Sequence, residues 1–419
     1  MTTLLLSHPA SLRHDMGAGH PERPDRMRVI HKALDDSAFA PLLRQEAPMG
    51  QIEAILRAHP RDYYDRLAQA APQQGLIQLD ADTRMNAGTW EAALSAVGAA
   101  TAAVDAVMLG KADNAFAATR PPGHHAERAT AMGFCFFNNI AIAARHAQAV
   151  HGVERVAIVD FDVHHGNGTQ EIFYADKSVL FCSSHEMPLY PGSGARSERG
   201  EHGQIVNAPL RAGDDGAVFR ELFETTILPR VKNFAPDLLL LSAGFDAHHR
   251  DPLANINLVE DDFAWVTGRL MDIAARSAKG RLVSLLEGGY DLRAWQVRWR
   301  RMCGCWRGWG VKTGHHCKSA TQFMIWQLPS LGSGMLILRT RIFWTRTWFF
   351  GLRNSLKPPP PPTTASSAPS ENHTANLSPP PPPCTFPQSS APVPPASASS
   401  AGLRPAWPPR ACGCAAGRG

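Results

Sequence analysis

Five short apolar runs, none of them interrupted by alternating polar residues, constrain the fold of this chain most strongly. Such runs indicate strands that are buried on both faces, as in a parallel sheet. Helical patterns separate them, and this alternation predicts an open, three-layer α/β fold. The predicted strands are Ala115–Thr119, Val156–Val159, Val179–Cys182, Leu238–Leu241 and Leu282–Leu286, and the predicted helices are Thr89–Leu109, Asn138–Val150, Ala217–Lys232 and Glu260–Ala278.

The composition changes abruptly at Trp295. From there to Gly419 the chain has 14 basic residues but a single acidic one, together with 19 of its 34 prolines and 6 of its 8 cysteines. The first 294 residues carry a net charge of −8, so the total of +5 comes from the tail. This distribution argues against a basic nucleic-acid binder. Cys135 and Cys182 are the only cysteines before the break, which excludes a disulfide scaffold and favours a cytoplasmic location.

We therefore expect residues 1–294 to form the folded domain and residues 295–419 to be a disordered, Pro-rich tail, because this composition cannot bury a core. When the tail is back-translated with one base inserted after the codon for Ala294 and a GC-rich choice of codons, its start reads as an amphipathic helix, so we predict a frameshift close to Trp295, either in the gene or from sequencing. We expect no signal peptide. One uncharged stretch of the tail, Ser319–Leu338, contains Gln, Ser, Gly and Pro, so we expect no membrane contact.

A polar cluster follows each predicted strand, at the sheet edge where open α/β folds place their sites. A catalytic zinc takes three ligands from His, Asp, Glu or Cys and keeps one open position. Asp162, His164 and Asp246 supply such a set, which suits Zn²⁺ and would also accommodate Fe²⁺ or Co²⁺. The pair His124 and His125 can move protons near neutral pH, and Tyr290 can donate its hydroxyl to a polarised carbonyl.

These clusters resemble the motifs of the zinc-dependent histone deacetylase family. The similarity is greatest to its class II branch, with the bacterial histone deacetylase-like amidohydrolases and acetylpolyamine amidohydrolases, and it runs from about His8 to Leu292. It implies the arginase–deacetylase fold for residues 1–294. The motifs are His20-Pro-Glu-Arg-Pro, Pro121-Pro-Gly-His-His, Gly133-Phe-Cys-Phe-Phe-Asn, Asp160-Phe-Asp-Val-His-His-Gly-Asn-Gly-Thr, Ala243-Gly-Phe-Asp-Ala and Glu287-Gly-Gly-Tyr.

The resemblance implies a role for each motif residue. Asp162, His164 and Asp246 bind one Zn²⁺, and His125 is the general base with His124 as its electrostatic or acid partner. Asp160 and Asn167 hold His124 and His125, Tyr290 stabilises the oxyanion, and Gly133, Phe134 and Tyr190 line an acetyl-lysine tunnel. A structural K⁺ is implied near Asp160, Asp162, His164 and Ser183, and His20, Glu22 and Arg23 are expected to shape the site entrance.

The implied reaction releases acetate from an N-acetyl amide. An acetylated lysine peptide, an acetylated polyamine or another small amide would suit the tunnel, and Leu253 favours acyl-lysine because polyamine-selective members tend to have acidic residues near the mouth. One alternative is a binuclear-metal ureohydrolase of the same fold, which needs further carboxylates where Val163 and Ala247 lie. Another is an inactive product of a frameshifted gene, because the altered C-terminus is expected to leave the sheet edge and the Tyr290 loop without cover. The oligomeric state cannot be read from the sequence.

Overall fold

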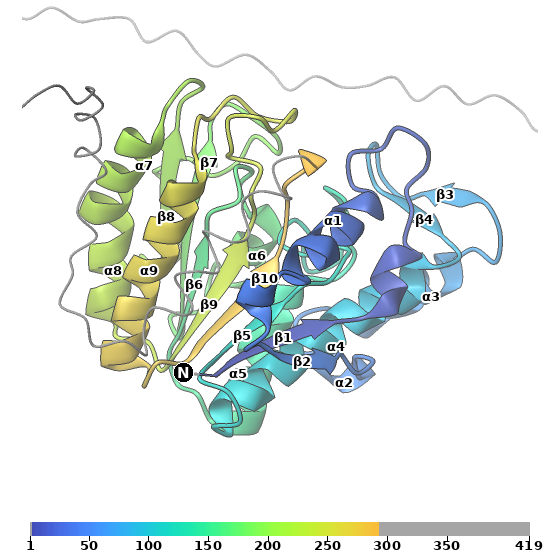
Figure 1. Ribbon diagram of the computed structural model, residues 1–419, viewed down its shortest axis with the longest axis horizontal. Helices are drawn as coiled ribbons and strands as arrows, with labels where there is room; N and C mark the ends of the chain where they lie inside the picture. The colour runs from blue at the N-terminus through green and yellow to red at the C-terminus, as the bar shows by residue number, and fades with distance from the viewer. Residues whose placement is uncertain (1, 293–419) are drawn as a thin grey trace, which may run out of the picture. The chain divides into compact units, whose positions relative to one another are not determined.

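The fold is built on an eight-stranded sheet in which every neighbouring pair of strands is parallel (Figure 1). The computed structural model describes residues 2–292, so the predicted tail and frameshift lie outside the described residues. Across the sheet the strands are β2 (Leu43–Glu46), β1 (Thr3–Ser7), β5 (Asn114–Ala117), β10 (Leu282–Leu286), β9 (Leu238–Ala243), β6 (Val156–Asp160), β7 (Val179–Glu186) and β8 (Ile205–Leu210). A short antiparallel pair, β3 (Leu76–Gln78) and β4 (Arg84–Asn86), lies outside this sheet.

Helices cover both faces of the sheet (Figure 1). One face carries α4 and α5, and the other carries α1, α7, α8 and α9. Alternate strand residues point to opposite faces, so Ile158 packs with the first group and Val159 with the second. The bounds are α1 Asp25–Leu34, α2 Ile52–Ile55, α3 Arg61–Ala70, α4 Thr89–Met108, α5 Asn139–His151, α6 Asn167–Ile172, α7 Gly216–Leu222, α8 Leu228–Phe234 and α9 Glu260–Ser277. The predicted three-layer α/β fold is confirmed.

The predicted elements differ from the structure in two respects. The five predicted strands form the centre of the sheet, but β1, β2 and β8 were not predicted. The predicted helix Ala217–Lys232 is broken into α7 and α8 by a π-helical segment at Phe223–Ile227. Pro229 in the first turn of α8 supplies no backbone N–H, which is typical of a helix start.

The position of β10 bears on the expectation that the altered C-terminus uncovers a sheet edge. This strand is the last one described, yet it lies between β5 and β9 in the middle of the sheet, and the edges are β2 and β8. Residues 3–286 therefore supply all eight strands of the described sheet, while the expected loss of cover over the Tyr290 loop concerns residues outside the described ones and stays a prediction.

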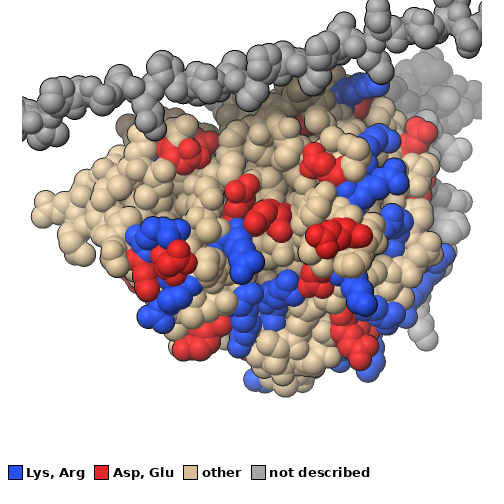
Figure 2. Space-filling view, turned by 180° about the vertical axis from the view of Figure 1, so that it is seen from behind, with Lys and Arg blue, Asp and Glu red and all other residues tan. Residues whose placement is uncertain are grey.

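Two surface properties bear on partners. Among the described residues α4 alone is long and apolar enough to cross a membrane, but 67% of its apolar window is buried inside the molecule, as in a core helix. Figure 2 shows acidic and basic side chains interspersed on the face seen from behind. That face shows no stripe of basic side chains, the usual footprint of nucleic-acid binding.

Candidate active site

The carboxyl ends of β5, β6, β9 and β10 bring the predicted site residues together from distant parts of the chain. The backbone N–H of Val163 donates to Asp246 Oδ1 at 2.8 Å, and that of Gly288 donates to Asp162 Oδ2 at 2.8 Å. The N–H of Gly123 donates to Glu287 Oε2 at 2.7 Å. Because backbone groups hold these carboxylates, their positions are set by the sheet itself.

Asp162, His164 and Asp246 converge on a single point. Each offers one ligand atom, and these atoms lie within 4.8 Å of one another. His164 Nδ1 lies 3.2 Å from Asp162 Oδ1 and 3.1 Å from Asp246 Oδ2. Ligands bonded to tetrahedral zinc at 2.0–2.1 Å are about 3.3 Å apart. The donor set and its spacing therefore fit one divalent cation.

Two glycines lie directly beside these carboxylates, where any larger side chain would clash with them. A Cβ on Gly244 would lie 2.0 Å from Asp162 Oδ2, and one on Gly288 would lie 2.2 Å from Asp246 Oδ2. Burial and the nearby charge of Asp162 raise the pKa of Asp246 to about 7. Two buried carboxylates that repel each other in this way would be stabilised by a divalent cation.

His124 and His125 lie beside the triad, with their ring centres 4.0 Å apart. His124 Nδ1 donates to Asp160 Oδ2 at 2.9 Å, and His125 Nδ1 lies 2.8 Å from Asn167 Oδ1. Burial lowers the pKa of His124, but the carboxylates of Asp160 and Asp162 outweigh it and raise the pKa to about 10. Burial and the neighbouring imidazoles of His124 and His164 hold the pKa of His125 well below its usual range. The His124 ring is thus kept charged and the His125 ring is kept neutral.

Two of the predicted tunnel residues, Gly133 and Tyr190, lie against His125, and the third, Phe134, lies between His20 and Tyr290. Gly133 has a left-handed φ of 57°, and a Cβ there would lie 2.4 Å from the His125 ring. The Phe134 ring lies 4.7 Å from the ring of His20 and 5.8 Å from that of Tyr290. The Tyr190 ring lies 5.2 Å from that of His125. Aromatic rings therefore lie close to His125 and to Tyr290.

Arg26 of α1 fixes the loop that carries Tyr290. Its guanidinium lies 4.8 Å above the Tyr290 ring and donates to the carbonyls of Gly289 and Glu287. The Tyr290 N–H donates to Asp251 Oδ2 at 2.6 Å. Burial and the nearby carboxylates raise the pKa of the Tyr290 hydroxyl well above its usual range, so that the hydroxyl keeps its proton and can donate it in a hydrogen bond.

The expectation that Glu22 shapes the site entrance is wrong. Its side chain is fully buried and accepts hydrogen bonds from Arg120 and from Arg26 Nη1, the latter at 3.1 Å. Glu22 is therefore the counter-ion of the two guanidiniums beneath the site. His20 contacts Phe134, one of the predicted tunnel residues, and its role at the entrance stays a prediction. The implied K⁺ stays a prediction, and the Ser183 hydroxyl contacts His185 Nδ1 at 2.9 Å.

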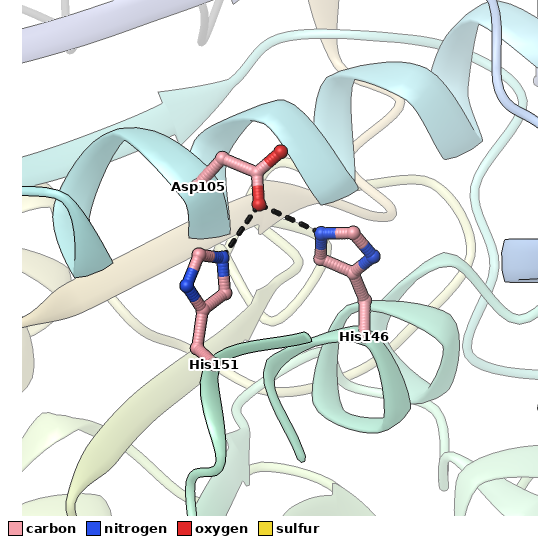
Figure 3. Close-up of side chains that lie close together, drawn as sticks. All are labelled: Asp105, His146 and His151. Carbon is pink, nitrogen blue, oxygen red and sulfur yellow. Dashed lines mark hydrogen bonds and ion pairs between the residues drawn. The ribbon is translucent and has the colours of Figure 1, made fainter. Parts of the chain in front are cut away.

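A second group of metal-ligating side chains lies away from this edge (Figure 3). Asp105 of α4 faces His146 and His151 of α5, and each Nε2 lies 2.7 Å from Asp105 Oδ1. Arg57 Nη1 donates to His146 Nδ1 at 3.1 Å, so Nε2 of that ring carries the proton. The 2.7 Å distances, together with the proton on His146 Nε2, indicate that these rings donate hydrogen bonds to the Asp105 carboxylate. We call these three residues the α4–α5 clamp.

Residues 20–305 match the model of the family described as histone deacetylase domain. The chain belongs to the histone deacetylase family. A histone deacetylase-like amidohydrolase of Pseudomonas aeruginosa is 42% identical over 279 residues, which cover 65% of this chain and 73% of that protein. A probable deacetylase of Archaeoglobus fulgidus is 38% identical over 298 residues, covering 70% and 82%. The crystal structure of the HDA15 HD domain is similar with a TM-score of 0.68 and 35% identity, covering 73% of this chain and 88% of that one.

The site of this histone deacetylase family member also contains residues that sequence reasoning missed. Arg26 contacts the Tyr290 loop across more than 260 positions of sequence, and no local pattern signals that contact. Glu127 accepts a hydrogen bond from Asn167 Nδ2 at 2.9 Å. A carboxylate two residues after the histidine pair is a local signal that could have found it.

Proposed function

We propose that the chain is a zinc-dependent deacetylase that hydrolyses N-acetyl amides to acetate and a free amine. Membership of a family of deacetylases and amidohydrolases supports the reaction class. The observation that carries the proposal is the convergence of Asp162, His164 and Asp246 beside the histidine pair. Their chemistry and spacing suit one Zn²⁺.

The three candidate metal ligands, the histidine pair and Tyr290 each have a step in this proposal. Asp162, His164 and Asp246 would hold Zn²⁺, which when bound polarises a carbonyl and lowers the pKa of water. The neutral His125 accepts the proton of the attacking water, and a protonated histidine of the pair donates a proton to the leaving amine. The Tyr290 hydroxyl donates a hydrogen bond to the carbonyl oxygen as negative charge develops there.

The substrate that we propose is an acetylated lysine peptide, with acetylated polyamines and other small amides as further candidates. Gly133, Phe134 and Tyr190 would line the tunnel for the acetylated side chain. Leu253, rather than an acidic residue, near the mouth favours acyl-lysine. We also propose a cytoplasmic location, supported by the free, buried thiols of Cys135 and Cys182.

The test uses the full 419-residue chain, purified and loaded with zinc. Metal content is measured by mass spectrometry, and acetate release is measured with a fluorogenic acetyl-lysine peptide, acetylated spermidine and acetamide-type substrates. We expect one zinc ion per chain and turnover of the peptide, with His125→Ala as the inactive control. A chain that binds zinc but releases acetate from no substrate would contradict the proposal.

The same measurements separate the alternatives. A ureohydrolase would bind two metal ions per chain, yet Val163 and Ala247 are buried in the apolar layer between the sheet and α9. An inactive product of a frameshifted gene would release no acetate, whereas the chain with its reading frame restored after Ala294 would do so. Turnover by the full chain would exclude that alternative.

A further inference from the structure

Asn167 bridges His125 and a carboxylate that no proposed step uses. Its Oδ1 lies 2.8 Å from His125 Nδ1, and its Nδ2 donates to Glu127 Oε1 at 2.9 Å. Nδ2 also lies 3.4 Å from the Met132 sulfur, a second acceptor. The three side chains thus form a row, from the carboxylate of Glu127 through the amide of Asn167 to the ring of His125.

The direction of hydrogen bonding along this row is set at its Glu127 end. A side-chain amide can turn by 180° and exchange its donor and acceptor with little change of shape. An ionised carboxylate only accepts, so Glu127 requires the NH₂ group of Asn167 to face it. The amide oxygen then faces His125, whose Nδ1 must carry the proton, and Nε2 is left with its lone pair free.

We propose that Glu127 is a positioning residue that fixes the tautomer of His125 through Asn167. The inference rests on the proposed function, because only a base with a free Nε2 can take a proton from water. Without the carboxylate, the Asn167 amide can turn and donate to His125 Nδ1. The ring proton then moves to Nε2, and the base is blocked.

The surroundings of Glu127 separate this role from a packing role. Its side chain is half-buried and lines an open cavity of about 560 Å³ together with Met132, Asn167 and Glu171. Losing one charged oxygen at the wall of an open cavity leaves no void in the core. Glu171 of α6 lies on the same cavity, but its carboxylate accepts from the backbone N–H of Arg128 at 2.9 Å. It is therefore a matched control.

The first experiment compares Glu127→Gln with Glu171→Gln in the zinc-loaded full chain. Glu127→Gln should lower kcat about 10- to 100-fold, the usual cost of removing a group that orients a site residue. KM, zinc content and Tm should stay unchanged, because substrate binding does not use the free Nε2. Glu171→Gln should keep the activity of the parent chain. An unchanged kcat in Glu127→Gln, or an equal loss in Glu171→Gln, would overturn the proposal.

A second experiment tests whether Glu127 acts through Asn167. Asp at position 167 only accepts, so it fixes the proton on His125 Nδ1 without help from Glu127. In the Asn167→Asp background, adding Glu127→Gln should therefore cause no further loss of kcat, and it removes a like-charge contact. A further loss by the same factor as in the parent chain would show that Glu127 acts independently of the amide.

A third readout needs no turnover. In the full chain labelled with ¹⁵N-histidine, nitrogen NMR distinguishes Nδ1–H from Nε2–H rings, and His125→Ala identifies the signals of His125. We expect Nδ1–H in the parent chain and in Glu171→Gln, and a shift toward Nε2–H in Glu127→Gln. Nε2–H in the parent chain would refute the tautomer assignment. Because this readout does not depend on acetate release, failure of the proposed function and failure of the inference are distinguishable.

Discussion

Asp246 and Asp162 show how strongly single side chains determine what this site can hold. Both carboxylates are fully buried, and the imidazole of His164 lies within 3.2 Å of each. Each Asp also accepts a backbone N–H, so neither carboxylate can turn away from the other without losing a hydrogen bond. The site is thus organised for a cation by the main chain.

We expect Asp246→Ala to abolish stoichiometric zinc binding and activity together. The substitution leaves two of the three ligands, and a site with two ligands lacks the set that a catalytic zinc requires. Mass spectrometry of the purified variant measures the zinc content. The matched control is Asp105→Ala in the α4–α5 clamp, which should keep one zinc ion per chain. A loss of zinc in the control would show that the clamp, too, binds metal.

Tyr290→Phe removes one hydroxyl and leaves the ring between Arg26 and Phe134. If the hydroxyl stabilises negative charge that develops on the carbonyl oxygen, kcat should fall about 10²- to 10³-fold, as for other oxyanion donors. Zinc content should stay unchanged, because Tyr290 is not among the three ligands. Steady-state kinetics with the acetyl-lysine peptide measure the change. Full activity in this variant would remove Tyr290 from the mechanism.

At the scale of elements, α1 and the loop after β10 form one unit. Arg26 is fully buried, and its guanidinium joins Glu22 to the carbonyls of Glu287 and Gly289. A buried guanidinium needs a counter-ion and filled hydrogen bonds, and this one has both. The N-terminal part of the domain thus sets the position of the loop that carries Tyr290.

The sequence predicts elements well where burial leaves a pattern. The five central strands, such as β9 with its run of four leucines, are rich in apolar residues because both of their faces are covered. β2 has the sequence Leu-Arg-Gln-Glu and is exposed at the sheet edge, so it carries no apolar signal. β8 contains Asn207 and Pro209, which are both depleted in strands. The two edge strands were therefore missed and the centre was found, whereas β1 was missed although it carries the buried apolar run Leu4–Leu6.

The candidate site, too, has a part that the sequence predicts and a part that it misses. Its ligands and histidines come directly after central strands, and these residues could be selected from the sequence. The contacts that support these residues could not be predicted from the sequence. Arg26, for example, contacts Gly289 from helix α1, which is far from Gly289 along the chain. Glu22 stands within a motif, yet its burial depends on Arg120, which is nearly one hundred positions away. Motifs indicate the chemistry of the site, whereas only the fold shows what supports it.

The α4–α5 clamp should contribute little to stability, and its contribution should depend on pH. Asp105→Asn should lower the free energy of unfolding at pH 7 by at most about 1 kcal/mol, because the group is partly exposed. Burial raises the pKa of Asp105, but hydrogen bonds from His151 and His146 outweigh it and lower the pKa below its ordinary value. A lowered pKa in the folded state means that the stabilisation is complete above about pH 4 and is lost at lower pH.

Urea unfolding of Asp105→Asn and the parent chain at a series of pH values measures this dependence. The difference in free energy between the two should shrink as the pH falls below about 4, because the parent carboxylate becomes protonated. A difference that stays constant down to pH 2 would mean that the carboxylate charge contributes nothing to the clamp.

For the whole molecule, the order of the strands decides what the altered C-terminus can affect. The described residues contain the eight strands of the sheet, with β10 in its middle, and all residues of the proposed site. The frameshift close to Trp295 stays a prediction about the gene. Sequencing the DNA across the codon for Ala294 tests it directly, and an intact reading frame there would end the hypothesis.

Metal binding should be visible in the stability of the whole domain, because the site is assembled from separate strands that only the folded state brings together. A ligand at about 1,000 times its Kd stabilises the folded state by about 4 kcal/mol. For a domain of about 290 residues, whose unfolding entropy is about 0.6 kcal/mol/K, that corresponds to a Tm shift of roughly 7 °C. Calorimetry of the full chain before and after dialysis against a chelator should show this fall. Asp246→Ala should show none, and an equal fall in that variant would place the stabilising metal elsewhere.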